Sequence, residues 1–283
     1  MRLKLLGVAI DKVTMEEASI QIASWVSQNK QEYVVTPNVE MVMASQKDKH
    51  FMEVLNQAGL AIPDSARLGW ALDIQAQSGM ISRLLKWPLF LLPNLSAGKD
   101  FPVTTGTDLM EKLLQLSEEK GLRVGLLGGE KNVAIKLTEC LQKKYPKLLI
   151  QFVQENLNVD WEGNHTFFEM QNIIGFKQNQ IISSSREDDF YQNLNSRKID
   201  LLFVAFGHTK QEKWINRNLK QTNVKVMMGV GGAFDYLSGQ VSRAPMWMRA
   251  SGLEWLYRLI LQPWRITRFG SLVRFVFLVL FKK

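Results

Sequence analysis

The chain has 283 residues, of which 46% are hydrophobic and 22% are charged, and its formal net charge is +8. This length and composition exclude a disordered or fibrous chain and predict a globular protein with a full core. The single cysteine, Cys140, excludes a disulfide framework and is typical of a reducing compartment. Residues 1–8 are too short an apolar run for a signal peptide, and no run reaches the roughly 20 apolar residues of a membrane span. We therefore expect a cytoplasmic protein.

Six short apolar runs alternate with segments of helical periodicity, a pattern that predicts an α/β fold with a parallel sheet flanked by helices. The predicted strands are Tyr33–Thr36, Leu60–Ile62, Arg123–Leu127, Leu148–Val153, Asp200–Phe206 and Val224–Met228. The predicted helices between them run from Thr14, in a capping box with Glu17, to about Val26, from Asp108 to Lys120, and from Lys131 to Lys144. Residues 81–100 and 155–190 fit this alternation poorly, and we interpret the second segment as irregular surface.

The end of the chain differs in character from the rest. Residues 243–283 hold eight Lys or Arg residues and one acidic residue, Glu254, so this segment carries nearly all of the net charge. It also holds three Trp and four Phe residues, and basic residues mixed with such rings favour a lipid surface. We expect helices over Pro245–Leu261 and Trp264–Phe281. The predicted organisation is therefore a core of residues 1–239 followed by a helical membrane-binding appendage of residues 240–283.

Polar residues follow several predicted strands, where ligands of parallel sheets bind. They are Thr36-Pro37-Asn38, Pro63-Asp64-Ser65, Gly207–Glu212 and Gly229–Asp235. Each has a simple structural explanation, since Asp64 can be a helix N-cap and Gln211 and Glu212 a polar first turn. The glycines lack the G-x-G-x-x-G spacing of a dinucleotide site, and the three histidines make no metal-site spacing.

The order of these motifs along the chain is more specific than any one of them. In sequence they are Thr36-Pro37-Asn38, Pro63-Asp64, Gly106-Thr107-Asp108-Leu109, Leu194-Asn195-Ser196, Lys210–Ile215, Gly229–Asp235, Arg243-Ala244-Pro245 and Gly252–Leu259. This series resembles the WecG/TagA/CpsF glycosyltransferases from about Tyr33 to Arg268. The resemblance implies a Rossmann-like core and inverting, metal-independent transfer from a UDP-sugar without a cofactor. The implied acceptor is undecaprenyl-diphosphate-linked N-acetylglucosamine, at the inner face of the cell membrane.

The resemblance also assigns roles to residues. Asp64 matches the proposed catalytic base, and Thr36 and Asn38 match polar pocket residues around it. Arg258, Arg265 and Arg268 match arginines that close over the diphosphate. We expect further substrate contacts from residues at the strand ends, namely Gln211, Glu212, Gly231, Gly232 and Asp235. One carboxylate suits an inverting transfer, because it can accept the proton of the acceptor hydroxyl.

The chain departs from the family pattern at several positions. Ser65 stands where a glycine is common, Val103 where an arginine is common, and His208-Thr209 replaces a pair such as Ala-Pro. The segment between Asp64 and Gly106 is about twice the expected length. It holds Arg83, Lys86 and Lys99, which could replace the lost charge, and the apolar residues Trp87, Leu89, Phe90, Leu91 and Leu92, which could enter the bilayer.

Three other interpretations stay open. The chain could be a degenerate transferase that binds a nucleotide-sugar or lipid without catalysis. It could use a uronic acid or hexose donor. Its basic tail could bind nucleic acid, which would give duplex binding that weakens steeply with salt. We favour a membrane surface over nucleic acid, and the sequence leaves open whether the chain forms a homo-oligomer.

Overall fold

A six-stranded parallel sheet, with strand order β4-β3-β12-β11-β5-β6, forms the centre of the computed structural model. The structure describes residues 1–76, 79–90, 104–155, 157–167, 173–174, 181–182, 187–250, 253–261, 263 and 269–281. The strands are β3 (Glu32–Val35), β4 (Leu60–Ala61), β5 (Arg123–Gly128), β6 (Leu149–Gln154), β11 (Leu201–Ala205) and β12 (Val226–Gly229). The predicted parallel sheet and α/β class are confirmed.

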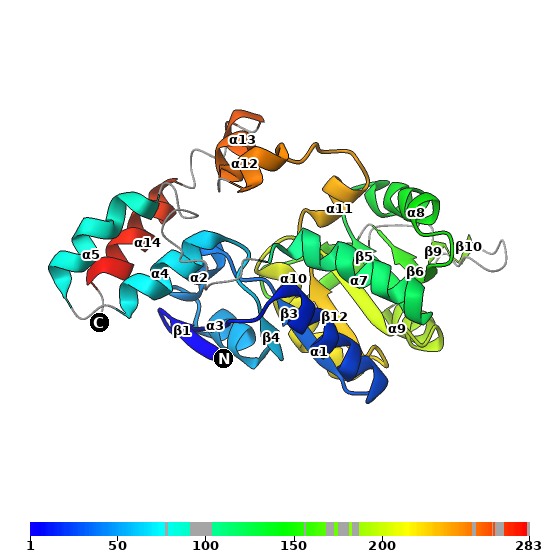
Figure 1. Ribbon diagram of the computed structural model, residues 1–283. Helices are drawn as coiled ribbons and strands as arrows, with labels where there is room; N and C mark the ends of the chain where they lie inside the picture. The colour runs from blue at the N-terminus through cyan, green and yellow to red at the C-terminus, as the bar shows by residue number, and fades with distance from the viewer. Residues whose placement is uncertain are drawn as a thin grey trace.

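Helices cover both faces of this sheet, which is why central strands such as β11 are continuous apolar runs, buried at all five positions. One face is covered by α1 (Met15–Ser27), α7 (Gly106–Lys120), α8 (Val133–Lys144) and α11 (Ala233–Leu237), which share one core cluster (Figure 1). The other face is covered by α2 (Val39–Ser45), α3 (Lys49–Gln57), α4 (Ala66–Gln75), α9 (Glu187–Ser196) and α10 (Lys210–Asn218).

Charged residues bind the amino ends of three neighbouring strands together. Asp200, just before β11, accepts hydrogen bonds from the backbone N–H and the guanidinium of Arg123, which begins β5. Lys225, just before β12, lies 2.9 Å from the same carboxylate. Burial would raise the pKa of Asp200, but these donors outweigh it and the pKa is lowered. This cluster stabilises the edge of the sheet opposite to the predicted site.

Three antiparallel strand pairs lie outside the predicted elements. At the N-terminus, β1 (Arg2–Leu5) pairs with β2 (Val8–Asp11), so most of the run judged too short for a signal peptide is strand, in which Leu5 is buried. In the segment interpreted as irregular, β7 (Leu157–Val159) pairs with β8 (His165–Phe167), and β9 (Ile173–Ile174) pairs with β10 (Ile181–Ile182). Strands this short carry too little alternation to be distinguished from loops by sequence.

The end of the chain forms three helices, α12 (Met246–Ala250), α13 (Glu254–Leu261) and α14 (Phe269–Phe281). The single helix predicted over Pro245–Leu261 is wrong, because Leu253 lies in neither α12 nor α13. Helix α14 packs beside α2, α4 and α5 (Met80–Lys86), at the left of Figure 1. Its residues Phe275 and Val279 are fully buried in the core cluster of that face. A cut at residue 240 would therefore remove core side chains, and the predicted two-part division stays a prediction.

Part of the long segment after Asp64 contributes to the core as well. The 3-10 helix η1 (Trp87–Phe90) ends in Phe90, whose ring lies 5.1 Å from Trp70 and 6.2 Å from Phe275. The prediction that Phe90 enters a bilayer is wrong, because Phe90 is 7% exposed and fills this aromatic contact. Leu91, Leu92 and Lys99 lie outside the described residues. Over the ranges that the structure covers, every helix is too short or too polar to cross a membrane.

Candidate functional site

The loops at the carboxyl ends of four adjacent strands form the candidate site. Across the sheet these are the loops after β4, β3, β12 and β11, in that spatial order. The first three carry Asp64, Thr36 with Asn38, and Gly231 with Gly232, and the fourth carries His208 and leads into α10, whose first turn holds Gln211 and Glu212. Three strand spacings of about 4.8 Å separate the two outer loops, so the β4 and β11 ends lie about 14 Å apart. One edge of the sheet therefore collects most of the predicted site residues.

Asp64 lies half-buried between β4 and α4. Its Oδ1 accepts a hydrogen bond of 2.8 Å from the backbone N–H of Gly106, the first residue of α7. Its own backbone N–H donates to Pro37 O over 3.0 Å. The purely structural explanation of Asp64, as the N-cap of α4, is not supported, because Ser65 occupies that position. The carboxylate is instead held by the start of a helix more than 40 residues away in sequence.

Thr36 lies against the same turn of α7. A Cβ built on Gly106 would meet Thr36 Oγ1 at 3.0 Å, so glycine at 106 lets the two loops approach this closely. Three of the quoted motifs, those containing Thr36, Asp64 and Gly106, thus meet at one point. Asn38 has a local role, because its side chain accepts from Met41 N at 2.9 Å and caps α2. The catalytic roles of Thr36, Asn38 and Asp64 stay predictions.

The glycine loop after β12 lies between the two outer parts of the site. Gly231 has a positive φ of 51°, which favours glycine, and Gly232 is the N-cap of α11. Asp235 is in the first turn of α11, where burial and the nearby charge of Glu130 raise its pKa. Gly232 is exposed, whereas the N–H of Gly231 is already used by Gln211. Substrate contacts from these three residues stay predictions.

Gln211 and Glu212 form an internal hydrogen-bonded chain below the loops. Gly231 N–H donates to Gln211 Oε1 at 3.0 Å, Gln211 Nε2 donates to Glu212 Oε1 at 2.7 Å, and Thr209 N–H donates to Glu212 Oε2 at 2.6 Å. Gln211 is 4% exposed and Glu212 is 1% exposed. Burial raises the pKa of Glu212 to about 7, although these hydrogen bonds oppose the rise. Gln211 therefore binds the backbone of the loop after β12, and Glu212 binds the backbone of the loop after β11. A direct contact of either residue with the substrate stays a prediction.

A histidine–carboxylate pair that the sequence analysis did not identify lies at the same edge. His208 Nε2, in the loop after β11, is 3.3 Å from Glu40 Oε2 in the first turn of α2. The backbone around His208 is unusual, since Gly207 has φ of 82° and the β-branched Thr209 has φ of 74°. Such a conformation is strained for threonine and persists only when the surroundings enforce it. Here the buried Glu212 holds Thr209 N–H in place.

A second missed cluster joins the tail to the core. Arg243 Nη1 donates to Asp108 Oδ1 at 2.6 Å, and Arg249 Nη1 lies 3.7 Å from the same oxygen. Thr105 Oγ1 donates to the other oxygen, Oδ2, at 2.7 Å. Asp108 and Arg243 each belong to a quoted motif. Only their opposite charges could have predicted this ion pair from the sequence. Because 135 residues separate them, nothing in the sequence indicated that these two charges pair.

A further cation follows Asp64 by one helical turn. The guanidinium of Arg67 lies 5.3 Å from the centre of the Phe90 ring, and burial lowers its pKa to about 10. Of the residues expected to replace the charge absent at Val103, Arg83 donates to Gln75 O over 3.4 Å and Lys86 is exposed. Arg265 and Arg268 lie outside the described residues, as does the side chain of Arg258, whose backbone is in α13. The roles of these three arginines stay predictions.

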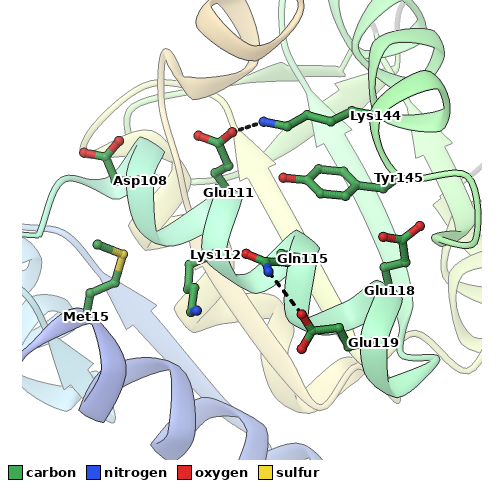
Figure 2. A pocket seen from close by; sticks show the side chains of 9 residues that line it. All are labelled: Met15, Asp108, Glu111, Lys112, Gln115, Glu118, Glu119, Lys144 and Tyr145. Carbon is green, nitrogen blue, oxygen red and sulfur yellow. Dashed lines mark hydrogen bonds and ion pairs between the residues drawn. The ribbon is translucent and has the colours of Figure 1, made fainter. Parts of the chain in front are cut away.

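Figure 2 shows a cavity of about 660 Å³ along α7, from Asp108 in its first turn to Glu119 near its end. Glu111, Glu118 and Glu119 from α7 line it, with Lys144 and Tyr145 from the end of α8 and Met15 from α1. Glu111 pairs with Lys144, and Gln115 donates to Glu119. This predominantly acidic lining repels a nucleotide diphosphate, so we place the site at the edge of the sheet instead. In the described part of the chain, no three His, Cys, Asp or Glu side chains group as metal ligands would.

The sequence matches one family model over residues 3–85 and 82–283, that of the glycosyl transferase WecG/TagA/CpsF family. The two matches together cover nearly the whole chain, and the break between them falls inside the long segment after Asp64. The resemblance inferred from the ordered motifs is confirmed by this match.

Curated relatives match over a similar extent. The chain is 26% identical over 278 residues to an N-acetylglucosaminyldiphosphoundecaprenol N-acetyl-beta-D-mannosaminyltransferase of Staphylococcus aureus (strain MRSA252), covering 98% of this chain and 91% of the relative. It is also 26% identical over 247 residues to a protein of the same name from Bacillus subtilis (strain 168), covering 87% of this chain and 78% of the relative.

Proposed function

The chain belongs to the WecG/TagA/CpsF glycosyltransferase family, and from that premise we propose its reaction. It transfers N-acetylmannosamine, or a related sugar, from a UDP-sugar to N-acetylglucosamine carried on a polyprenyl diphosphate. The names of the S. aureus and B. subtilis relatives support this donor sugar and this acceptor. The product would enter the synthesis of a cell-surface polysaccharide. The observation that carries the proposal is the meeting of Asp64, Thr36 and Gly106 at the carboxyl edge of the sheet.

In this proposal Asp64 is the general base of a single displacement. The acceptor hydroxyl oxygen attacks the anomeric carbon from the face opposite UDP, so the configuration at that carbon inverts. Asp64 takes the hydroxyl proton as the new bond forms, and the bond between sugar and diphosphate breaks with its electron pair leaving on UDP. The Gly106 N–H fixes the orientation of the carboxylate. A general base of this kind contributes about 100-fold to 10,000-fold in rate.

Positive charge from the tail would stabilise the departing UDP. Arg258, Arg265 and Arg268 are the proposed ligands of the diphosphate, because guanidinium groups bind phosphate oxygens in a bidentate geometry. In a site from which water is excluded, such charges act strongly on the transition state. The mechanism we propose uses these arginines in place of a metal ion.

A surface formed by α5 and α14 is the proposed contact with the membrane. Its exposed apolar residues lie on two helices that pack side by side, as Figure 1 shows. They are Ile81, Leu84, Leu85, Val273, Phe277 and Phe281. Lys86 and Arg274 are exposed on the same helices, and their charge suits anionic headgroups. This surface would bring the chain to its lipid-linked acceptor at the inner face of the membrane.

The test is transfer by purified protein with a panel of UDP-sugars and a short-chain lipid-linked N-acetylglucosamine. We expect acceptor-dependent release of UDP with UDP-N-acetylmannosamine, and NMR of the product should show the inverted configuration. Asp64→Asn should lower the rate at least about 100-fold. The matched control is Asp73→Asn, an exposed carboxylate on the following helix, which should leave the rate unchanged.

The same panel separates the alternatives. Release of UDP only with a uronic acid or hexose donor would change the donor and keep the reaction. Binding of UDP-sugars without release from any of them would refute the proposal and support a non-catalytic binding protein. Full activity with added chelator and no divalent ion is expected, and a strict requirement for such an ion would refute the metal-independent mechanism.

A further inference from the structure

The first turn of α7 holds both the proposed base and the start of the tail. The Gly106 N–H donates to Asp64 Oδ1 at 2.8 Å, and two residues later Asp108 Oδ1 accepts from Arg243 Nη1 at 2.6 Å. Residues of an α-helix rise about 1.5 Å each, so these two anchoring points lie about 3 Å apart along the helix axis. Because a helical turn is rigid, a group bound to Asp108 has a fixed position relative to Asp64.

The contact between Asp108 and the tail is partly buried and has several members. The side chain of Arg243 is 19% exposed and that of Asp108 is 34% exposed. Burial would raise the pKa of Asp108, but the hydrogen bonds from Arg243 and Thr105 outweigh it and the pKa is lowered. Arg249, in α12, lies 3.7 Å from the same carboxylate and brings a second cation from the tail. An exposed ion pair contributes little, whereas breaking a desolvated one has a large effect.

The tail has its other anchor on the opposite face of the sheet. Phe275 and Val279 of α14 are fully buried against α2 and α4, while Asp108 belongs to the face covered by α1, α8 and α11. The chain from Arg243 to Phe269 therefore passes from one face to the other. Helices α12 and α13 lie on this path, and Figure 1 shows them above the main body, joined to α11 by an extended segment.

We propose that Asp108 is a positioning residue, which through Arg243 and Arg249 fixes α12, and with it α13, relative to Asp64. This contact attaches the start of the segment between the two anchors to α7. The inference rests on the proposed function, because α13 carries Arg258, a proposed ligand of the diphosphate. It adds to that function the element that fixes the arginine-bearing segment relative to the base.

The test measures the position of α13 and the rate of transfer in the same variants. In a Cys140→Ser background, spin labels are attached at Ile260→Cys on α13 and Gln115→Cys on α7, both exposed positions. Asp108→Asn keeps the size of the side chain and its backbone N–H bond to Thr105 but removes the charge. We expect it to broaden the distance between the labels and to lower kcat at least tenfold, since small misplacements can cost about 100-fold.

Two further variants make the test specific. Asp108→Glu keeps the charge and should restore a narrow distance and most of the rate. Glu111→Gln removes another carboxylate of α7, which forms its ion pair with Lys144 and acts on Arg243 only as a weaker charge, so it should change both quantities much less than Asp108→Asn does. The proposal is overturned if Asp108→Asn behaves like Glu111→Gln, or if it broadens the distance without lowering kcat. If the unmodified protein transfers no sugar at all, the proposed function fails, and the label distances alone decide whether Asp108 holds the tail.

Discussion

The buried carboxyl group of Glu212 gives the stability of the fold a distinct pH dependence. Its pKa is raised from 4.5 to about 7, so the folded state binds this proton more tightly than the unfolded state does. The stabilisation is therefore complete below about pH 4.5 and is lost as the pH rises through about 7. A tenfold change in proton affinity is worth about 1.4 kcal/mol, so the loss amounts to about 3 kcal/mol.

The perturbation is Glu212→Gln, which removes the titrating group. It also breaks the polarity of the hydrogen-bonded chain, because the N–H groups of Thr209 and Gly231 both point into it. Only a carboxyl group can accept at both of its oxygens. In every orientation of the two side-chain amides, those of Gln211 and of the new glutamine, one N–H group of the chain faces another N–H group. Such an unsatisfied donor costs about 1–3 kcal/mol of stability. The variant should be less stable than the unmodified protein at low pH and should lose less stability as the pH rises.

Urea unfolding followed by circular dichroism at about pH 4.5 and about pH 8 measures this difference. We expect the stability advantage of the unmodified protein over Glu212→Gln to shrink by about 3 kcal/mol between these two values. Glu17→Gln is the matched control, because Glu17 occupies the same place in the capping box of α1 but is fully exposed. Hydrogen bonds from Thr14 lower the pKa of Glu17, so its stabilising contribution is lost at low pH instead. Parallel pH profiles for the unmodified protein and Glu212→Gln would refute the reasoning.

Three other changes test the site and the membrane surface. Gly229→Ala should lower stability by about 1–3 kcal/mol in urea unfolding, because its Cβ would lie 2.8 Å from Gln211 Nε2. His208→Gln should raise KM for the donor about tenfold in steady-state kinetics with kcat nearly unchanged, since it removes an imidazole hydrogen-bonding group from the loop after β11. Ile81→Asp should reduce sedimentation with anionic vesicles, whereas Ile20→Asp, equally apolar and exposed but on α1, should not.

The parts of the fold that the sequence predicted are those with a strong local signal. The strands of the sheet are apolar runs bounded by polar residues, and the start of α1 was identified from the capping box of Thr14 and Glu17. The predicted end of α7 at Lys120 is confirmed, and the next residue, Gly121, has a positive φ of 65°, which favours glycine. In each case the residues that form the element also specify it, so no distant contact is needed to predict it.

Elements that depend on distant contacts could not be predicted in this way. Phe90 and its neighbours form an apolar run next to prolines, and nothing in that run shows that Phe275 will cover it. The hairpin of residues 157–167 is similar, because its strands are three residues long and pack against α10. Periodicity reports which residues are apolar, whereas the partner that buries them is set by the topology of the whole chain.

In the candidate site, too, the sequence predicted single residues from local signals but not the contacts between distant ones. Asp64 was identified because it follows a strand, but the group that holds it, Gly106 N–H, is backbone and has no side-chain signature. Asp108 and Arg243 were both quoted as motif residues, yet their pairing required the first turn of α7 and the segment after α11 to be placed in space. In the proposed mechanism, proton transfer at Asp64 and charge from the tail act on the same bond, so their relative position would decide the rate. We propose that one turn of α7 sets that position, and a substitution at Asp108 therefore tests the mechanism more directly than one at any tail arginine.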